Sequence, residues 1–250
     1  MWMASASVAD RDTSTAVRLM DGEPQKQSRA FFGRRKGHKL RPRQSALIET
    51  LLPRLALDLS QPAPADLTAL FAPPVNDIAL EIGFGGGESM IAQASDQPQT
   101  GFLGVEPFVN GMVKALAAIE KSDLRNIRLH FDDAVSLIGW LPEASVGRID
   151  LLHPDPWPKR RHWKRRFVQD EMLARLARIL RSGGEFRFVT DVADYAAWTL
   201  VRFLRSEHFQ WTARFADDWR RPWPGFTPTR YHTKAAREQR ASCFLVFRRT

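Results

Sequence analysis

The sequence predicts an α/β fold in which a mostly parallel, seven-stranded sheet carries helices on both faces. Two observations lead to this prediction. Short apolar runs alternate with amphipathic stretches through most of the chain, which is typical of a parallel sheet covered by helices. Two further apolar runs near the C-terminus have no long helix between them, and this favours an antiparallel final strand pair.

The expected elements can be placed in chain order. A first helix is expected at 44–57, and a proline-rich segment then leads to the first strand. The strands of the alternating region are predicted at 78–82, 102–106, 127–131, 149–153 and 185–190. The helices that alternate with them are predicted at 87–96, 108–122, 133–140, 164–181 and 192–206. The final strand pair is predicted at 208–214 and 242–247.

The length of 250 residues, 44% of them hydrophobic, fits one well-cored domain with an appendage better than two domains. Residues 1–30 show little periodicity, and we expect a flexible N-terminal tail there. Residues 31–76 are interpreted as a basic N-terminal extension that contains a helix, and residues 77–250 as the catalytic domain.

The chain is basic, and its positive charge is clustered. Lys and Arg number 37 against 28 Asp and Glu, which gives a formal net charge of +9. Residues 25–44 hold eight basic residues and no acidic one, and six of the eight residues at 159–166 are basic. Clusters this dense attract phosphates, whereas scattered charge mainly aids solubility, so the pattern predicts a nucleic acid partner.

Several other classes of protein and site are disfavoured. Cys243 is the only cysteine, so an intrachain disulfide is excluded and a reducing, cytoplasmic location is expected. None of the six histidines stands at metal-ligand spacing from Cys243 or from another histidine, so we expect no metal. No apolar run approaches the roughly 18 residues needed to span a bilayer, so we expect no membrane association.

A glycine-rich turn follows the first predicted strand, with Gly83, Gly85 and Gly87 at every second position. Glycines at such a turn let the backbone approach a cofactor closely. Glu106 ends the next strand, where a carboxylate can accept hydrogen bonds from both hydroxyls of an adenosine ribose. These features would also suit a nicotinamide dinucleotide, and a tight loop alone is the simplest alternative.

Glu81 favours S-adenosyl-L-methionine over the dinucleotide. Glu81 precedes the glycines on the strand itself, near the position that the amino-acid end of S-adenosylmethionine occupies in methyltransferases. A dinucleotide needs unobstructed helix-terminal amides for its pyrophosphate, and the glycine spacing here also differs from G-x-G-x-x-G. After the third strand, Asp132 and Asp133 stand where an acceptor for the adenine amino group is common in methyltransferases. A helix N-cap is the competing interpretation for either residue.

The loop after the fourth predicted strand is the most informative segment. Pro154, Pro156 and Pro158 stiffen it, so Asp155 and Trp157 are expected to be held in fixed directions. A carboxylate and an aromatic ring beside a cofactor cavity can bind a purine, the first through its N–H groups and the second by stacking. The alternative is a surface turn that leads into a basic helix.

With these motifs the chain resembles the TrmB-type tRNA (guanine-N7)-methyltransferases from residue 31 to its C-terminus. The resemblance rests on Phe32-Gly33-Arg34-Arg35-Lys36-Gly37-His38, on 80–88, on Gly104-Val105-Glu106-Pro107-Phe108 and on 154–166. It implies a Rossmann-like class I methyltransferase fold and methyl transfer from S-adenosyl-L-methionine to N7 of the variable-loop guanine at tRNA position 46. Whether such a protein is a monomer or a homodimer stays open.

The resemblance also implies residue roles. Asp155 is expected to be catalytic, and the S-adenosylmethionine site is expected to contain Glu81, Gly83, Gly85, Gly87, Glu106, Asp133 and Asp155. Substrate contacts are expected from Lys159, Asp191, Thr229, Arg230, Tyr231 and His232. RNA contacts are expected from Arg34, Arg35, Lys36, Arg161, His162, Trp163, Lys164, Arg165 and Arg166.

Two positions depart from the family pattern. His232 stands where a glutamate is expected, which puts a carboxylate role there in doubt and leaves nearby Glu238 as a substitute. His153 stands before Pro154 where an aromatic residue is more usual, and we expect it to pack or to hydrogen-bond locally. A non-catalytic RNA-binding protein on the same scaffold is the main alternative function. Retention of Glu81, Glu106 and Asp155 argues against it, because phosphate binding requires none of them.

Overall fold

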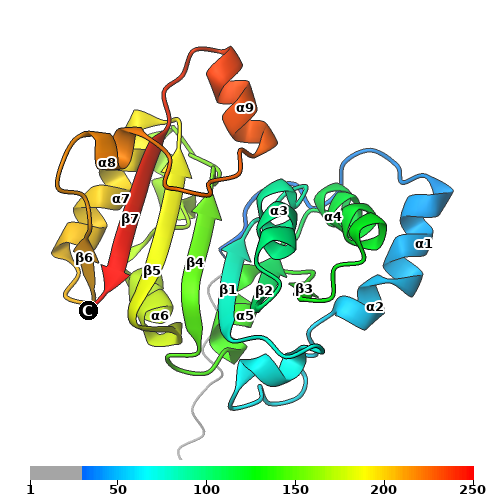
Figure 1. Ribbon diagram of the computed structural model, residues 1–250. Helices are drawn as coiled ribbons and strands as arrows, with labels where there is room; N and C mark the ends of the chain where they lie inside the picture. The colour runs from blue at the N-terminus through cyan, green and yellow to red at the C-terminus, as the bar shows by residue number, and fades with distance from the viewer. Residues whose placement is uncertain (1–29) are drawn as a thin grey trace, which may run out of the picture.

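The computed structural model describes residues 30–250, and these form a three-layered α/β domain (Figure 1). The tail expected at 1–30 therefore lies outside the described residues except for Ala30, as do Lys26 and Arg29 of the first basic cluster. The strands are β1 (Asp77–Ile82), β2 (Thr100–Val105), β3 (Ile127–His130), β4 (Val146–Leu152), β5 (Leu180–Thr190), β6 (Phe209–Trp211) and β7 (Cys243–Arg249).

The seven strands form one sheet in the order β3-β2-β1-β4-β5-β7-β6. Neighbouring strands from β3 to β5 are parallel, whereas β7 runs antiparallel to both β5 and β6. The predicted mostly parallel sheet with an antiparallel C-terminal pair is confirmed. The chain leaves β1 in one direction for β2 and β3 and returns on its other side for β4 and β5. A crevice at the carboxyl ends of β1 and β4 is therefore the expected place for a ligand.

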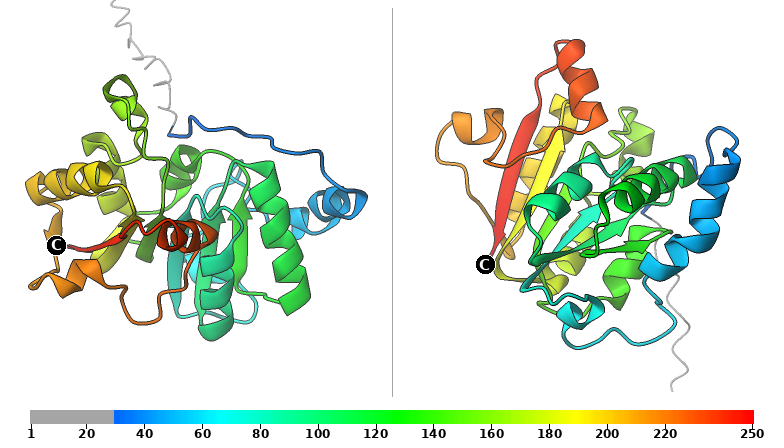
Figure 2. Two further views of the ribbon diagram at one scale, coloured as in Figure 1. Left: turned by 90° about the horizontal axis from the view of Figure 1, so that it is seen from above. Right: turned by 45° about the vertical axis from the view of Figure 1, so that its right-hand side comes forward.

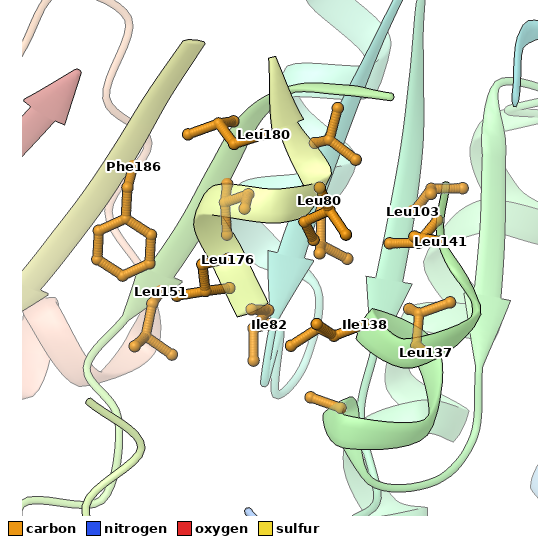
Figure 3. Packing of buried hydrophobic residues seen from close by; sticks show 14 of the residues in the cluster. Leu80, Ile82, Leu103, Leu137, Ile138, Leu141, Leu151, Leu176, Leu180 and Phe186 are labelled. Carbon is orange, nitrogen blue, oxygen red and sulfur yellow. The ribbon is translucent and has the colours of Figure 1, made fainter. Parts of the chain in front are cut away.

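Helices cover both faces of the sheet (Figures 1 and 2). Alternate residues of β1 face opposite ways, so Ala79 joins the apolar cluster on one face and Leu80 the cluster on the other. The Ala79 face is covered by α3 (Glu88–Asp96) and α4 (Val109–Ser122), and the Leu80 face by α5 (Ala134–Trp140), α6 (Asp170–Ile179) and α7 (Ala193–Arg205). Figure 3 shows the second cluster, in which Leu80 and Leu151 of the sheet meet Ile138 and Leu176 of the helices.

The helix predicted at 44–57 is two helices, α1 (Pro42–Thr50) and α2 (Leu52–Leu55). Pro53 has no backbone N–H to continue the first helix, which explains the break. Both helices pack into the cluster on the Ala79 face, through Leu47, Leu52 and Leu55. A short 3₁₀ helix, η1 (Leu67–Leu70), was not predicted.

The helix predicted at 164–181 is wrong at both ends. The basic residues form a separate 3₁₀ helix, η2 (Arg160–Arg165), and α6 begins only at Asp170, where two acidic side chains suit a helix N-terminus. At the other end the chain enters β5 at Leu180. The strand predicted at 208–214 is only the three residues of β6. Two short helices before β7, α8 (Asp217–Arg220) and α9 (Arg230–Arg237), were also not predicted.

Candidate active site

A cavity of about 500 Å³ lies at the carboxyl edge of the sheet. Its walls come mainly from the loops after β1, β2, β3, β4 and β5, from α9 and from residues 30–34. In Figure 1, α9 lies beyond the carboxyl ends of β4 and β5, so it faces this edge. The volume falls in the range of sites that bind a small molecule. The crevice expected at the crossover between β1 and β4 is therefore present.

The glycine-rich turn forms one wall of the cavity. Gly83, Gly85 and Gly87 all have positive φ, at 69°, 59° and 79°, a conformation that a side chain would strain. Gly83 and Gly85 line the cavity. Gly87 is the N-cap of α3 and does not line the cavity. Gly111 of α4 packs so closely on the Gly85 carbonyl that a β-carbon on Gly111 would collide with it. The positive φ angles and this close backbone approach thus require glycine at these positions.

Glu106 ties the glycine turn to the end of β2. One carboxylate oxygen accepts the Gly85 N–H at 2.6 Å, and the other accepts the Phe108 N–H at 2.8 Å. Burial raises the pKa of the Glu106 carboxyl to about 7, although these two backbone N–H groups act in the opposite direction. The carboxylate lines the cavity and has acceptor sites left for two hydroxyl groups.

Glu81 is not among the residues that line the cavity. It is almost fully buried beside Asp150, its neighbour across the sheet, and one of its oxygens has no hydrogen-bond partner among the described residues. Burial, reinforced by Asp150, raises the pKa of the Glu81 carboxyl well above its ordinary value. The structure therefore places Glu81 next to the cavity wall and not on its surface.

Asp133 caps α5 and also lines the cavity. Its carboxylate accepts the Val135 N–H at 2.9 Å, as an N-cap does. The same carboxylate accepts the N–H groups of Ala30 and Phe31, at 3.0 and 2.7 Å. The helix-capping interpretation of Asp133 is thus realised in the structure, together with a contact to the N-terminal segment that the sequence did not reveal.

Residues 30–38, which we call the strap, run from the cavity, which residues 30–34 line, to the start of α4. Beyond Asp133, the strap is attached by an ion pair of 2.7 Å between Arg35 and Asp132. The Arg35 carbonyl also accepts the Val109 N–H at the start of α4. Arg34 lines the cavity, Arg35 is occupied by Asp132, and Lys36 is exposed. Of these three residues, expected to contact RNA, only Arg34 is placed at the cavity.

The loop after β4 holds Asp155 and Trp157 against the cavity, as its prolines suggested. Partial burial raises the pKa of the Asp155 carboxyl. Trp157 has a positive φ of 43°, and the Arg165 guanidinium lies 4.9 Å from its ring centroid. The Pro156 carbonyl accepts the Nε–H of Arg166 at 2.9 Å, which fastens the loop to the residue that follows η2.

The basic run divides into exposed and buried side chains. Lys159, Arg161 and Lys164 are exposed, and His162, Trp163 and Arg165 are half-buried. Trp163 packs edge-on against Trp198 of α7, with 5.3 Å between the ring centroids.

Arg166 is fully buried, forms an ion pair with Asp194, and lies about 5 Å from the ring centroids of Tyr195 and Trp198. The expected RNA contact of Arg166 is a mistake, because no phosphate can reach its guanidinium.

The expected substrate residues lie in two groups. Asp191, Arg230 and Tyr231 line the cavity, whereas Lys159 is exposed outside it. Thr229 and His232 do not line it either. Thr229 caps α9 by accepting the His232 N–H at 3.2 Å.

The His232 side chain is held by contacts outside the cavity lining, apart from the one with His153. Its Nδ1 lies 3.3 Å from the Ser242 hydroxyl, and its ring packs among Phe226, Phe244 and His153. Glu238, the possible substitute carboxylate, is paired with Arg240 at 2.6 Å and does not line the cavity.

Sequence reasoning missed several residues of the cavity wall. Arg240 and Lys234 line it from the end of the chain, and Phe31 and Phe32 line it from the strap. Nothing in the local sequence distinguishes Lys234 or Arg240, whereas Phe32 opens one of the segments that carry the family resemblance. Within residues 30–250, no group of three His, Cys, Asp or Glu side chains could hold a metal ion. No helix in the same range is long and apolar enough to cross a membrane.

Comparison with known proteins shows which family the chain belongs to. The protein family described as putative methyltransferase matches residues 75–245. The chain is 60% identical over 220 residues to a tRNA (guanine-N(7)-)-methyltransferase of Rhodopseudomonas palustris (strain HaA2), covering 88% of this chain and 86% of that one. It is 58% identical over 233 residues to the Bradyrhizobium diazoefficiens protein of the same name, covering 93% and 99%.

The chain belongs to the tRNA (guanine-N7)-methyltransferase family. Among solved structures, the 16S rRNA methyltransferase KamB has a similar fold, with a TM-score of 0.50 and 14% identity over 76% of this chain and 94% of that one. At such identity the likeness concerns the fold alone. The resemblance inferred from 80–88 and 154–166 is thus confirmed as family membership.

Proposed function

We propose that this chain transfers a methyl group from S-adenosyl-L-methionine to N7 of a guanine in tRNA, giving 7-methylguanosine and S-adenosylhomocysteine. The observation that carries the proposal is a single cavity in which the glycine turn and Glu106 face Asp155 and Asp191. The relatives at about 60% identity, named for this activity, support the choice of tRNA and of N7. By the same resemblance, the target is the variable-loop guanine at position 46.

The residues around the glycine turn fit S-adenosylmethionine. Gly83 and Gly85 leave a wall without side chains, against which a flat or extended group can lie. Glu106 offers acceptors to two adjacent ribose hydroxyls. Asp133 accepts the N–H groups of Ala30, Phe31 and Val135, which leaves one acceptor site, on Oδ1, for an adenine amino group. Bound S-adenosylmethionine supplies an electrophilic methyl group on a sulfonium sulfur. Glu81 would act on the amino-acid end only from behind the wall of the cavity.

Asp155 is proposed to bind the guanine and to stabilise its charge. Guanine N7 carries a free lone pair and no proton, so no base is needed to create the nucleophile. Methylation leaves a positive charge on the ring, and a carboxylate nearby interacts with it more favourably as it develops. The rest of catalysis is positioning, for which about 7–11 kcal/mol is available in principle when donor and acceptor are held in line.

The target base has to leave its stack to reach this cavity, and two aromatic rings can receive it. Trp157 lines the cavity and is held by Arg165, whereas Tyr231 is 48% exposed at the start of α9. Around them, Lys159, Arg161 and Lys164 form an exposed cationic surface that suits backbone phosphates. Phosphate contacts fix the register of an RNA without reading its sequence, so tRNA shape would select the guanine. Because the proposed substrate is tRNA and Cys243 is the only cysteine, we place the protein in the cytoplasm.

The test is methyl transfer from labelled S-adenosylmethionine to unmodified tRNA, with the product mapped by chain cleavage at 7-methylguanosine. We expect label at one guanine, and none when that guanine is replaced by adenine. Label on another base, or on protein, would refute the proposed substrate. Binding of tRNA without transfer would favour a non-catalytic RNA-binding protein.

A further inference from the structure

The two histidines that depart from the family pattern lie together at the cavity wall. The ring centroids of His153 and His232 are 5.8 Å apart, although the two residues are 79 positions apart in the sequence (232 − 153 = 79). Of this pair, only His153 lines the cavity. On its other side, His153 Nδ1 lies 3.2 Å from Oδ1 of Asp191, which follows β5.

His153 is held in one orientation. It has a positive φ of 51°, its N–H donates to the Val189 carbonyl at 2.8 Å, and its side chain is 3% exposed. Burial, with the nearby His232 and Arg240, lowers the pKa of the imidazole to about 4, so the ring is neutral near pH 7. Because a carboxylate can only accept, the proton of the neutral ring lies on Nδ1 and is donated to Asp191. The opposite ring nitrogen, Nε2, is buried without a partner in the described chain.

Asp191 is held from a second side by Arg240. The Arg240 guanidinium forms an ion pair with Oδ2 of Asp191, and Arg240 is itself paired with Glu238. The Asp191 side chain is 13% exposed and lines the cavity. A carboxylate has about four acceptor sites, so one site on each oxygen stays available after these contacts. Asp191 and Asp155 follow neighbouring parallel strands, so the two carboxylates share one rim.

We propose that His153 and Arg240 are positioning residues, which hold the Asp191 carboxylate so that it accepts N–H groups of the target base. The inference rests on the proposed function and deepens it. Guanine carries a ring N–H and an amino group side by side on one edge, and a fixed carboxylate accepts both at once. Adenine and cytosine have no such pair of neighbouring donors. Asp191 thereby selects guanine, while Asp155 acts on the developing charge.

The test compares two replacements of His153 in tRNA methylation. His153→Phe keeps a ring but removes the donor, whereas His153→Asn places an amide N–H close to the position of Nδ1 and tolerates positive φ. We expect His153→Phe to lower kcat/KM for tRNA about tenfold, mainly through KM, which corresponds to 1.4 kcal/mol. His153→Asn should stay within about threefold of wild type. Affinity for S-adenosylmethionine, measured by calorimetry, should change in neither variant.

A double-mutant cycle separates positioning from packing. If His153 acts through Asp191, His153→Phe has little further effect once Asp191→Asn is present. The matched control is His208→Phe, which alters a half-buried histidine remote from the cavity and should leave kcat/KM unchanged. If His153→Phe does not fold, Arg240→Gln tests the same coupling from the other side of Asp191.

Four outcomes would overturn the inference. Additive losses in the cycle, or a His153→Asn variant as poor as His153→Phe, would refute positioning while wild-type methylation stays intact. A loss confined to S-adenosylmethionine affinity would place His153 in the cofactor site instead. Wild-type protein that binds S-adenosylmethionine but transfers no methyl group to tRNA would refute the proposed function and, with it, this inference.

Discussion

The two sides of the cavity are built in different ways. On the donor side, Gly83, Gly85 and Glu106 are fixed by backbone geometry, through positive φ angles and two N–H bonds to one carboxylate. On the acceptor side, Asp191 depends on the side chains of His153 and Arg240, which come from distant parts of the chain, and Asp155 is held by its proline-rich loop. Consequently, the donor side should lose cofactor affinity when it is altered, and the acceptor side should lose rate or RNA recognition.

The largest effect is expected on the acceptor side, from Asp155→Asn. The amide keeps the size of the side chain but not the negative charge that offsets the methylated ring. We expect kcat at saturating tRNA and S-adenosylmethionine to fall about 100-fold or more, as when an electrostatic contact to a transition state is removed. Rapid-quench measurement of a single turnover checks this. Near-normal transfer by this variant would show that Asp155 does not stabilise the charge.

The next effect is a pH-dependent loss of stability on the acceptor side, caused by His153. The pKa of His153 is about 4 in the folded chain and about 6.5 when unfolded, so between these values the unfolded chain binds more protons. Stability should therefore fall as the pH is lowered through this window, by up to about 3 kcal/mol. Urea unfolding of wild type and His153→Asn, compared at pH 7 and pH 4.5, isolates this contribution. An equal pH dependence in the two proteins would show that His153 titrates normally.

On the donor side, Glu106→Gln should weaken S-adenosylmethionine binding about 10- to 30-fold, because one carboxylate oxygen becomes an amide that cannot accept the N–H or a hydroxyl. The kcat at saturating cofactor should change by less than about threefold, since the variant alters ground-state binding. Calorimetry and steady-state kinetics measure the two effects. Glu120→Gln, which breaks only an exposed ion pair with Arg43, is the matched control. A loss in kcat alone would contradict the assignment of Glu106 to cofactor binding on the donor side.

A rising pH should strengthen cofactor binding in wild type but not in Glu106→Gln. The pKa of Glu106 is raised to about 7, so the carboxylate that accepts ribose hydroxyls becomes fully populated only above pH 7. In the unfolded chain this carboxyl ionises near 4.5, so stability from its protonated form is present below 4.5 and is lost as the pH rises through 7. Titration of S-adenosylmethionine at pH 6 and pH 8 tests the binding effect. Affinity that does not change with pH would assign the ribose to another acceptor.

The smallest effect is expected from the exposed basic surface at η2, which lies outside the donor and acceptor sides of the cavity. Combined replacement of Lys159, Arg161 and Lys164 by serine should reduce the salt dependence of tRNA binding by roughly two to three units of log-log slope, with kcat preserved. Replacing the exposed Lys114, Lys121 and Arg125 changes the net charge equally and is the control. Equal slopes in the two triple variants would show that the surface at η2 does not contact the RNA backbone.

The sequence predicts each side of the cavity as far as that side leaves a local pattern in the sequence. The glycine turn and the strands around it leave local signals in the sequence, namely glycines at positive φ and short apolar runs, so periodicity and glycine spacing were sufficient to place them. The Asp133 cap of α5 was one of two interpretations that the sequence allowed. In contrast, the contact of Asp191 with His153 joins residues 38 positions apart, and no local pattern reports such a contact.

Two errors differ in their physical origin. Arg166 belongs to a basic run that looks uniformly exposed, yet it pairs with Asp194 and packs among aromatic rings of α7. Tertiary contacts thus divided a segment that composition treats as one. The helix at 44–57 failed for a local reason instead, since Pro53 breaks a stretch whose apolar residues continue the helical period.

The strap has a practical consequence for anyone who shortens this protein. Because Phe31, Phe32 and Arg34 form part of the cavity wall, a truncation beyond residue 30 removes binding surface and not merely an appendage. It would also leave the Asp133 carboxylate without two of its N–H donors and Asp132 without Arg35. A shortened chain that begins at the first strand would therefore have an opened site and would also lose the core residues Leu47, Leu52 and Leu55, even though every strand of the sheet is retained.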